Sequence, residues 1–254
     1  MAPRLVLIHG GMHTGGCWDD TVEAVAELRP DIQVDVVDLP GRRSCPADLA
    51  SLTIADCVDA VSQQIVEHAA GDGDRPIVLV GHSLAGVVLP GVVNSLGVDK
   101  IAQVIFVACC VPPPGQCVVD TLPRVLKPIV RYLAGRSGII DRVPPGLTRY
   151  SFGNAATAEQ RGRIHANMVP ESSALITEIP ADRLPDGVRT SWVLTQRDRA
   201  LPAAKQRGFI ANIGGVDDLR YVDAAHEVMI THPVELAAIL IELATAAGQA
   251  DRIR

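Results

Sequence analysis

Short apolar runs recur along most of the chain, each four to six residues long and separated by longer stretches with a different pattern. The runs are rich in valine, isoleucine and leucine and show little alternation between apolar and polar positions. This pattern is typical of strands that are covered on both faces of a sheet. The predicted strands are 4–8, 33–37, 77–80, 104–108, 190–195 and 219–222.

The stretches between these runs have the periodicity of amphipathic or buried helices. The predicted helices are 18–28, 54–70, 84–95, 203–213 and 233–246. Strands and helices that alternate in this way form a parallel sheet with right-handed crossovers, flanked by helices. We therefore expect an α/β fold with a mostly parallel sheet of about six strands. One such unit accounts for the whole chain, 1–254, because α/β folds of about 250 residues commonly form a single domain.

The alternation stops between residues 112 and 186, where prolines cluster and helical pieces follow one another without intervening strands. The two clearest pieces are 122–133 and 158–168. Loops longer than about 15 residues in compact domains are usually functional or disordered, and this segment carries apolar residues that can anchor it. We interpret 112–186 as an inserted helical cap, or lid, and keep a surface excursion without a role as the alternative.

Composition and charge narrow the classes of protein that fit. Apolar residues make up 48% of the chain and charged residues 20%, which suits a buried core and argues against disorder. A net charge of −6 leaves no basic surface for nucleic acid. The apolar runs are too short or too interrupted to cross a bilayer, and the N-terminus leads into the first strand without a signal-peptide pattern. We expect a cytoplasmic protein that binds neither nucleic acid nor membranes.

Six cysteines are scattered through the sequence, and Cys109 and Cys110 are adjacent. The sequence contains no Cys-x-x-Cys pair and no paired spacing of cysteine and histidine. We interpret the cysteines as buried reduced thiols, and we expect neither a disulfide framework nor a metal site.

A serine follows the third predicted strand in the sequence Gly-His-Ser-Leu-Ala-Gly, residues 81–86. A serine between a buried strand and a helix matches a nucleophile elbow, in which small neighbours allow a strained turn and the hydroxyl stands above the carboxyl edge of the sheet. The usual form is Gly-x-Ser-x-Gly; here Ala85 takes the place of the second glycine and Gly86 follows it. The string alone also fits an ordinary strand-to-helix turn. Its context leads us to predict Ser83 as a nucleophile.

A glycine-rich loop, His-Gly-Gly-Met-His at residues 9–13, comes directly after the first predicted strand. Such loops supply a backbone N–H donor to an oxyanion, and the N–H after the nucleophile supplies another. We predict that the amides of Gly11 and Leu84 are these donors. The neighbouring residues predicted to contact the substrate are Gly10, Met12 and His82. A tight turn that only needs glycine is the structural alternative, and His9 and His13 are expected to hydrogen-bond loop backbone.

A serine hydroxyl is a weak nucleophile near neutral pH and needs a base, which in turn needs a group that fixes its tautomer. In hydrolases with a nucleophile elbow the chain order is nucleophile, acid, histidine. His226, after the last predicted strand, is the predicted base, and Asp198, in the loop after strand 190–195, is the predicted acid. His232 and Asp223 are the respective runner-up residues. The structural alternative for an aspartate at a strand end is a helix cap.

Together these motifs resemble a known group, the plant methyl-ester esterase and hydroxynitrile lyase branch of the α/β-hydrolases, with its bacterial esterase relatives. The likeness spans nearly the whole chain and is weakest in the segment 112–186. The residues that carry it are 7–11, 16–18, 38–41, 81–86, 195–202 and 225–226. The resemblance implies the α/β-hydrolase fold, the same roles for Ser83, His226 and Asp198, and the same two amide donors.

Two departures from the lyase members of this group bear on the reaction. Those members have a threonine after the first loop histidine and a lysine after the catalytic histidine, whereas this sequence has Gly10 and Glu227 at these positions. The lysine would stabilise leaving cyanide, so its absence favours ester hydrolysis. Epoxide hydrolases and haloalkane dehalogenases of the same fold place aspartate at the elbow, and Ser83 disfavours both.

The resulting hypothesis is a serine hydrolase that cleaves a carboxylic ester, or a related thioester or lactone, through an acyl-enzyme on Ser83, with no metal or organic cofactor. Because aromatic residues make up only 3%, a pocket walled by aliphatic cap side chains would suit a small or medium apolar substrate. Arg42 and Arg43 either are solvated or meet an anionic substrate. A lyase or carbon–carbon bond hydrolase with the same triad and a non-catalytic binding module are the alternatives. A homodimer is left open.

Overall fold

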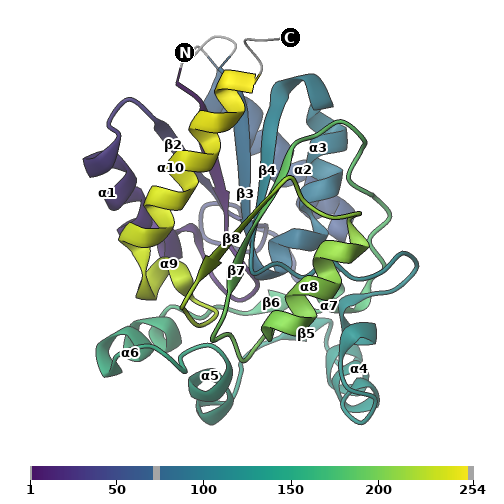
Figure 1. Ribbon diagram of the computed structural model, residues 1–254. Coiled ribbons are helices and arrows are strands. Elements are labelled where there is room, and N and C mark those ends of the chain that lie inside the picture. The colour runs from purple at the N-terminus through teal and green to yellow at the C-terminus, as the bar shows by residue number, and fades with distance from the viewer. Residues whose placement is uncertain (1, 71–74, 251–254) are drawn as a thin grey trace.

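Six parallel strands form one sheet at the centre of the protein (Figure 1). The computed structural model describes residues 2–70 and 75–250. The strand order is β2-β1-β3-β4-β7-β8, and every neighbouring pair is parallel. The strands are β1 (Arg4–Ile8), β2 (Gln33–Val37), β3 (Ile77–His82), β4 (Ile101–Val107), β7 (Thr190–Thr195) and β8 (Asp218–Val222). The predicted α/β fold with about six parallel strands is confirmed.

The central strands β1, β3 and β4 send alternate side chains into two apolar cores, one on each face of the sheet. In β1, Val6 and Ile8 belong to one core. Leu5 and Leu7 belong to the other, and all four side chains are fully buried. Because successive side chains of a strand point to opposite faces, a strand that is buried on both faces must be apolar throughout. This explains the continuous apolar runs in the sequence.

Helices cover both faces of the sheet (Figure 1). On one face lie α1 (Asp19–Leu28), α9 (Val228–Thr231) and α10 (Pro233–Ala250). On the other face lie α2 (Ile54–Ala69), α3 (Leu89–Leu96) and α8 (Ala203–Asn212). None of the helices that the structure describes is long and apolar enough to cross a membrane.

One predicted helix, 84–95, is divided in the structure. A 3-10 helix, Ser83–Val87, comes first, and α3 begins only at Leu89. Pro90 stands in the first turn of α3, where proline is tolerated because the N–H that it lacks would have no helical partner. The other 3-10 helices are Gly15–Trp18, Val98–Lys100 and Val118–Thr121.

The C-terminal ends of two strands also differ from the prediction. Strand β3 continues to His82, so that the turn at Ser83 follows it directly. Strand β4 ends at Val107, one residue before the predicted end. Ala108 has a φ of 44°, and this left-handed conformation cannot continue a strand.

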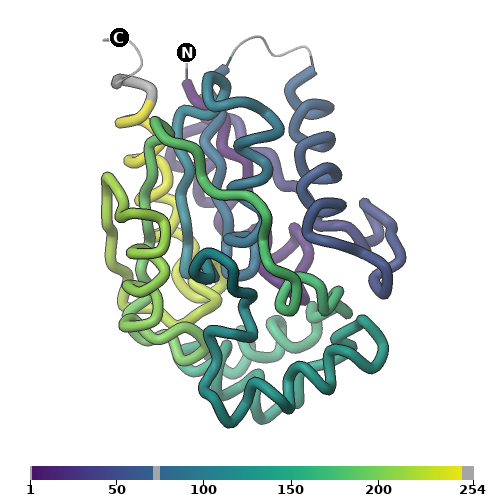
Figure 2. Tube along the Cα trace, turned by 90° about the vertical axis from the view of Figure 1, so that its right-hand side faces the viewer, coloured from purple at the N-terminus to yellow at the C-terminus, as the bar shows by residue number. Residues whose placement is uncertain are grey.

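The segment 112–186 lies across the end of the sheet where the strands finish, opposite the end where β1 begins (Figures 1 and 2). Its helices are α4 (Lys127–Gly135), α5 (Pro145–Ser151), α6 (Ala158–Ala166) and α7 (Ala174–Thr177). It also contains a short antiparallel pair, β5 (Ile139–Ile140) and β6 (Glu171–Ser172). The expectation of helical pieces without strands is therefore wrong, because strands of two residues leave no periodic pattern.

All six cysteines lie in the described part of the chain and are free thiols, as predicted. Five of them are buried, whereas Cys45 is only partly buried, so the prediction of burial is wrong at that position. Burial raises the pKa of the Cys57 and Cys110 thiols to about 12. Both thiols are therefore protonated near neutral pH and are poor nucleophiles.

Candidate active site

Ser83 stands at the sharp turn where β3 ends and the 3-10 helix Ser83–Val87 begins. Its φ of 51° lies in the left-handed region, which a non-glycine residue occupies under strain. A Cβ on Gly86 would lie 2.5 Å from the carbonyl oxygen of Cys110, so the close backbone contact requires glycine there. Ala85, which replaces the usual glycine, is accommodated in the core and fully buried. The turn has the geometry of a nucleophile elbow.

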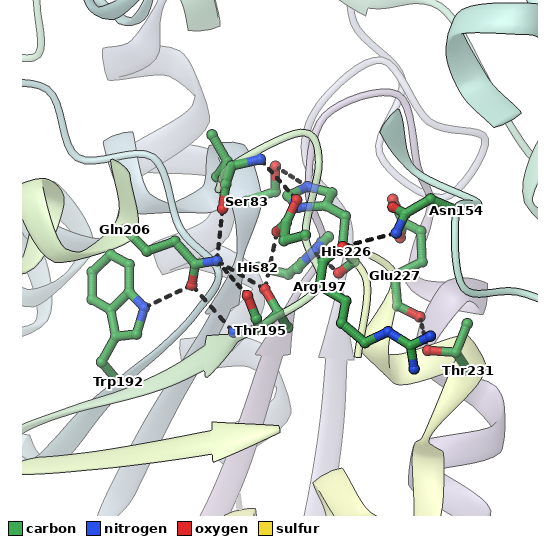
Figure 3. Close-up of polar contacts among 12 residues, drawn as sticks. His82, Ser83, Asn154, Trp192, Thr195, Arg197, Gln206, His226, Glu227 and Thr231 are labelled. Carbon is green, nitrogen blue, oxygen red and sulfur yellow. Dashed lines mark hydrogen bonds and ion pairs between the residues drawn. The ribbon is translucent and has the colours of Figure 1, made fainter. Parts of the chain in front are cut away.

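Three side chains from distant parts of the chain meet at this turn, and Figure 3 labels two of them, Ser83 and His226. His226 Nε2 accepts a hydrogen bond from the Ser83 hydroxyl at 2.9 Å, and His226 Nδ1–H donates to Asp198 Oδ2 at 2.7 Å. His226 and Asp198 are 1% and 4% exposed, whereas Ser83 is partly exposed. The structure thus brings the three sequence-predicted residues into the arrangement that a nucleophile, a base and an orienting acid require.

A buried hydrogen-bond network holds the loop that carries Asp198 (Figure 3). The carboxylate accepts hydrogen bonds from Thr195 Oγ1 at 3.0 Å and from Leu201 N–H at 2.7 Å. The Gln206 amide, on α8, donates to Thr195 Oγ1 at 2.9 Å and to the Leu201 carbonyl at 2.8 Å. Trp192 Nε1–H in turn donates to Gln206 Oε1 at 3.2 Å. Both carboxylate oxygens are engaged, so the acid is held in one orientation.

His82 is hydrogen-bonded to the backbone of the loop that carries His226. Its Nε2–H donates to the His226 carbonyl oxygen at 3.1 Å, and the two ring centroids are 4.7 Å apart. Burial, together with the nearby His226, lowers the pKa of His82 to about 3, so the ring is neutral. The His82 side chain is 1% exposed and lies in the protein interior. Substrate contact by His82 stays a prediction.

The segment 112–186 contacts the loops of the base and of the acid, and sequence reasoning did not find these contacts. The ring of Phe152, at the C-terminal end of α5, lies with its centroid 5.4 Å from that of His226. Asn154 Nδ2 donates to the backbone carbonyl of Arg197 at 2.8 Å (Figure 3). This segment therefore contacts the base, His226, and the loop that carries the acid, Asp198.

The pKa of His226 reflects two opposing effects. Burial lowers it, but the charge of Asp198 and the hydrogen bond to its carboxylate, with a smaller effect of Glu227, outweigh burial. The pKa of His226 is therefore raised above its ordinary value of 6.5. A higher pKa makes the imidazole a stronger acceptor for the proton of Ser83.

A buried ion pair joins the glycine-rich loop to the loop of His226. His13 Nε2–H donates to Glu227 Oε2 at 3.0 Å, and the two side chains are 7% and 2% exposed. Burial opposes both charges, but their mutual attraction is stronger: it lowers the pKa of Glu227 to about 2 and raises that of His13. The expected backbone hydrogen bond is confirmed for His9, whose Nδ1–H donates to the Gly10 carbonyl at 2.7 Å.

The glycine-rich loop lies directly against the nucleophile turn. A Cβ on Gly10 would lie 2.9 Å from the Cβ of Ser83. A Cβ on Gly11 would overlap the side chain of Leu84. A larger residue at either position would therefore displace the loop from Ser83. This contact places the backbone of the loop beside the hydroxyl; the donor roles of Gly11 and Leu84, and substrate contact by Gly10 and Met12, stay predictions.

The runner-up residues and the arginine pair lie outside the triad. His232 Nδ1 is 2.9 Å from the hydroxyl of the preceding threonine, and the Asp223 carboxylate is 73% exposed. The Arg42 guanidinium is fully buried and paired with Glu171, so the expectation that it is solvated or meets an anionic substrate is wrong. Arg43 is exposed, as expected of a solvated arginine.

His82, His226 and Glu227 bring three candidate metal-ligand atoms within 4.8 Å of one another. The other two triad members engage both ring nitrogens of His226. Glu227 is engaged by its ion pair with His13. Hydrogen bonds within the site therefore account for this cluster.

Comparison with known proteins agrees with the geometry. Residues 5–239 match the alpha/beta hydrolase family, and the chain belongs to that family. Methylesterase 7 from Arabidopsis thaliana is 24% identical, over 95% of this chain and 96% of that protein. Esterase PIR7B from Oryza sativa subsp. japonica is 25% identical, over 95% of both chains. These relatives confirm the resemblance to the plant esterases and the prediction of a carboxylic ester hydrolase.

Solved structures share the fold. An extracellular alpha/beta-hydrolase from a Paenibacillus species matches with a TM-score of 0.79 and 22% identity, covering 94% of this chain and 98% of that one. A methylesterase from Arabidopsis, MES16, matches with a TM-score of 0.75 and 17% identity, covering 96% and 99%. Because the first of these proteins is extracellular, the cytoplasmic location of the present protein stays a prediction.

Proposed function

We propose that this protein is a serine hydrolase that cleaves carboxylic esters through an acyl-enzyme on Ser83. The relay from Ser83 through His226 to Asp198, with hydrogen bonds of 2.9 and 2.7 Å, is the observation that carries the proposal. A purely structural role of the histidine would not explain why one ring nitrogen meets a strained, partly exposed serine and the other meets a buried carboxylate. The names of the esterase relatives support the same class of reaction.

In the acylation step, Ser83 Oγ attacks the carbonyl carbon of the ester while His226 Nε2 takes the hydroxyl proton. Asp198 stabilises the imidazolium that forms. The carbonyl oxygen becomes an oxyanion, for which we assign the N–H groups of Gly11 and Leu84 as donors. The tetrahedral intermediate collapses, the imidazolium gives its proton to the leaving oxygen, and the alcohol departs.

Water completes the cycle by attacking the acyl-enzyme. His226 takes a proton from this water as its oxygen bonds to the acyl carbon, and the Gly11 and Leu84 amides again hold the oxyanion. Collapse of the second intermediate returns the proton to Ser83 Oγ and releases the carboxylic acid. The chain's own groups supply every proton transfer.

We assign the segment 112–186 as a cap that shapes the substrate pocket. It lies over the carboxyl end of the sheet and places Phe152 beside His226. Val118 and Leu175 of the same segment pack in the core that contains the elbow residue Ala85. We expect the substrate to carry a small or medium apolar acyl or alcohol group in an ester, a thioester or a lactone.

A substrate panel with product analysis tests the proposal. It contains aryl and alkyl esters, thioesters and lactones of increasing size, together with cyanohydrins and β-diketones. The proposal predicts turnover of esters to one acid and one alcohol, with the highest kcat/KM for small or medium apolar groups. Faster turnover of cyanohydrins or β-diketones would show lyase or carbon–carbon bond hydrolase chemistry. A folded protein without any turnover would show a binding module.

The acid limb of the pH profile is a further expected result. His226 must be neutral to accept the Ser83 proton, and its pKa is raised above 6.5. We therefore expect kcat/KM to fall, as the pH is lowered, at a higher pH than an ordinary histidine would give. Initial rates of ester hydrolysis between pH 5 and pH 9 measure this limb. An acid limb below the ordinary histidine range would contradict the assignment of His226 as the base.

A Glu227→Gln variant should move this limb to lower pH. The charge of Glu227 raises the pKa of His226, and the substitution removes that charge. Glu235→Gln is a matched control, because Glu235 is an exposed carboxylate on α10 and its loss should leave the profile unchanged. A shift of the Glu227→Gln limb to higher pH would contradict the proposed electrostatics.

A further inference from the structure

Met12, in the glycine-rich loop, has an unusual backbone conformation and is hydrogen-bonded through both of its backbone polar groups. Its φ of 62° lies in the left-handed region. Both of its backbone polar groups are bound by one short stretch of the cap. Its N–H donates to Glu171 Oε2 at 3.0 Å, and its carbonyl accepts from Val169 N–H at 2.9 Å. The residue next to Gly11, the assigned oxyanion donor, is therefore held by the cap.

We call the contacts of Glu171 and Val169 with the backbone of Met12 the clamp. Arg42 connects this clamp to the body of the protein. Its guanidinium forms a bidentate ion pair with Glu171, and neither side chain is exposed. Arg42 Nε–H donates to the His13 carbonyl at 2.9 Å, and Nη1–H also donates to the Pro40 carbonyl at 2.9 Å. One arginine thus holds the loop after β2, the cap carboxylate and the residue that follows Met12.

We infer that Arg42 and Glu171 are positioning residues for the oxyanion-binding loop and act on the reaction through the backbone of Met12. The inference rests on the proposed function, because it concerns the amide donor of an acyl-transfer site. A non-glycine residue stays in the left-handed region only where its surroundings hold it there. Without the clamp Met12 relaxes, and the N–H of the adjacent Gly11 leaves the position that the oxyanion requires.

Each of the two carboxylate oxygens of Glu171 accepts two hydrogen bonds, so four donors share this side chain. Oε1 accepts from Arg42 Nη1–H at 3.0 Å and from Ser172 N–H at 2.9 Å. Oε2 accepts from Arg42 Nη2–H and from Met12 N–H. A glutamine side chain has only one acceptor oxygen and adds two N–H donors, so it cannot satisfy this set. A buried arginine would also lose its partner charge.

The Glu171→Gln variant tests the inference. We expect kcat for a good ester substrate, per active site, to fall on the order of 10²-fold while KM stays within about threefold, because the lost interaction acts on the transition state. Titration with a fluorophosphonate gives the concentration of active sites. The control is Asp20→Asn, which removes the 3.0 Å ion pair between Arg163 on α6 and Asp20 on α1. That pair also joins the cap to the body, but its side chains are 44% and 31% exposed, so kcat should not change.

The outcomes separate the clamp from the proposed function. Parent kcat in Glu171→Gln, alongside an inactive Ser83→Ala variant, overturns the clamp and leaves the serine mechanism in place. Parent activity in Ser83→Ala overturns the proposed function instead. A lower melting temperature with parent kcat per active site shows a purely structural ion pair and also overturns the inference.

A second variant covers failure of Glu171→Gln to fold. Glu171→Asp keeps the charge and both oxygens near Arg42 but shortens the side chain by one methylene, which withdraws the carboxylate from the Met12 amide. We expect the same pattern, a lower kcat with little change in KM. Parent kcat in Glu171→Asp would overturn the inference.

Discussion

In a Ser83→Ala variant, kcat for aryl esters is expected to fall roughly 10⁶-fold, with KM little changed. The substitution removes the Oγ that is hydrogen-bonded to His226 and keeps the Cβ at the strained turn, so we expect the fold to be retained. Initial rates with an aryl ester, together with the melting temperature, measure the two effects separately.

The matched control is Ser95→Ala, which removes an exposed serine hydroxyl on α3. It should leave kcat and the melting temperature at the values of the parent protein. Ester turnover in Ser83→Ala at the rate of the parent would show that another group is the nucleophile, and the proposed mechanism would then fail.

The Asp198→Asn variant is expected to lose about 10⁴-fold in kcat. An asparagine amide that faces the Nδ1 of His226 with its NH₂ group imposes the wrong tautomer on the ring, which then cannot accept the Ser83 proton at Nε2. The neutral side chain also removes the charge that raises the pKa of His226. Steady-state kinetics across the pH range measure both consequences.

Asp223→Asn is the matched control, because Asp223 lies in the loop before His226 but its carboxylate is 73% exposed. Its activity should equal that of the parent protein. A severe loss in Asp223→Asn with parent activity in Asp198→Asn would assign the acid to the runner-up residue and would contradict the geometry described above.

The strands of the central sheet could be predicted because burial on both faces leaves an unbroken apolar run. Strand β1, with five buried residues in a row, is the clearest case. The pair β5 and β6 could not be predicted, because two residues per strand are too few for a pattern. The break between the 3-10 helix Ser83–Val87 and α3 could not be predicted, because apolar residues continue through it without interruption.

The triad could be predicted because each of its residues sits in a short loop after a predicted strand, and parallel strands end at the same edge of the sheet. A local signal was therefore available for Ser83, Asp198 and His226. The burial of His82 could not be predicted, because adjacency to the serine does not say which way a side chain points.

Two buried ion pairs, Arg42–Glu171 and His13–Glu227, could not be predicted from the sequence. Arg42 and Glu171 are 129 residues apart, and His13 and Glu227 are 214 residues apart. A charged residue in a loop is most often solvated, and no local pattern distinguishes one that pairs in the interior. The packing of the segment 112–186 against the glycine-rich loop brings Glu171 to Arg42. The loop after β8, packed against the same glycine-rich loop, brings Glu227 to His13.

Labelling with a fluorophosphonate, followed by peptide mapping, tests the central claim most directly, because this reagent forms a stable bond with an activated serine hydroxyl. We expect one adduct per folded chain, located on Ser83, and much slower labelling of the Asp198→Asn variant. Folded protein that hydrolyses esters without an adduct on Ser83, or that carries the adduct on another residue, would show that Ser83 is not the nucleophile.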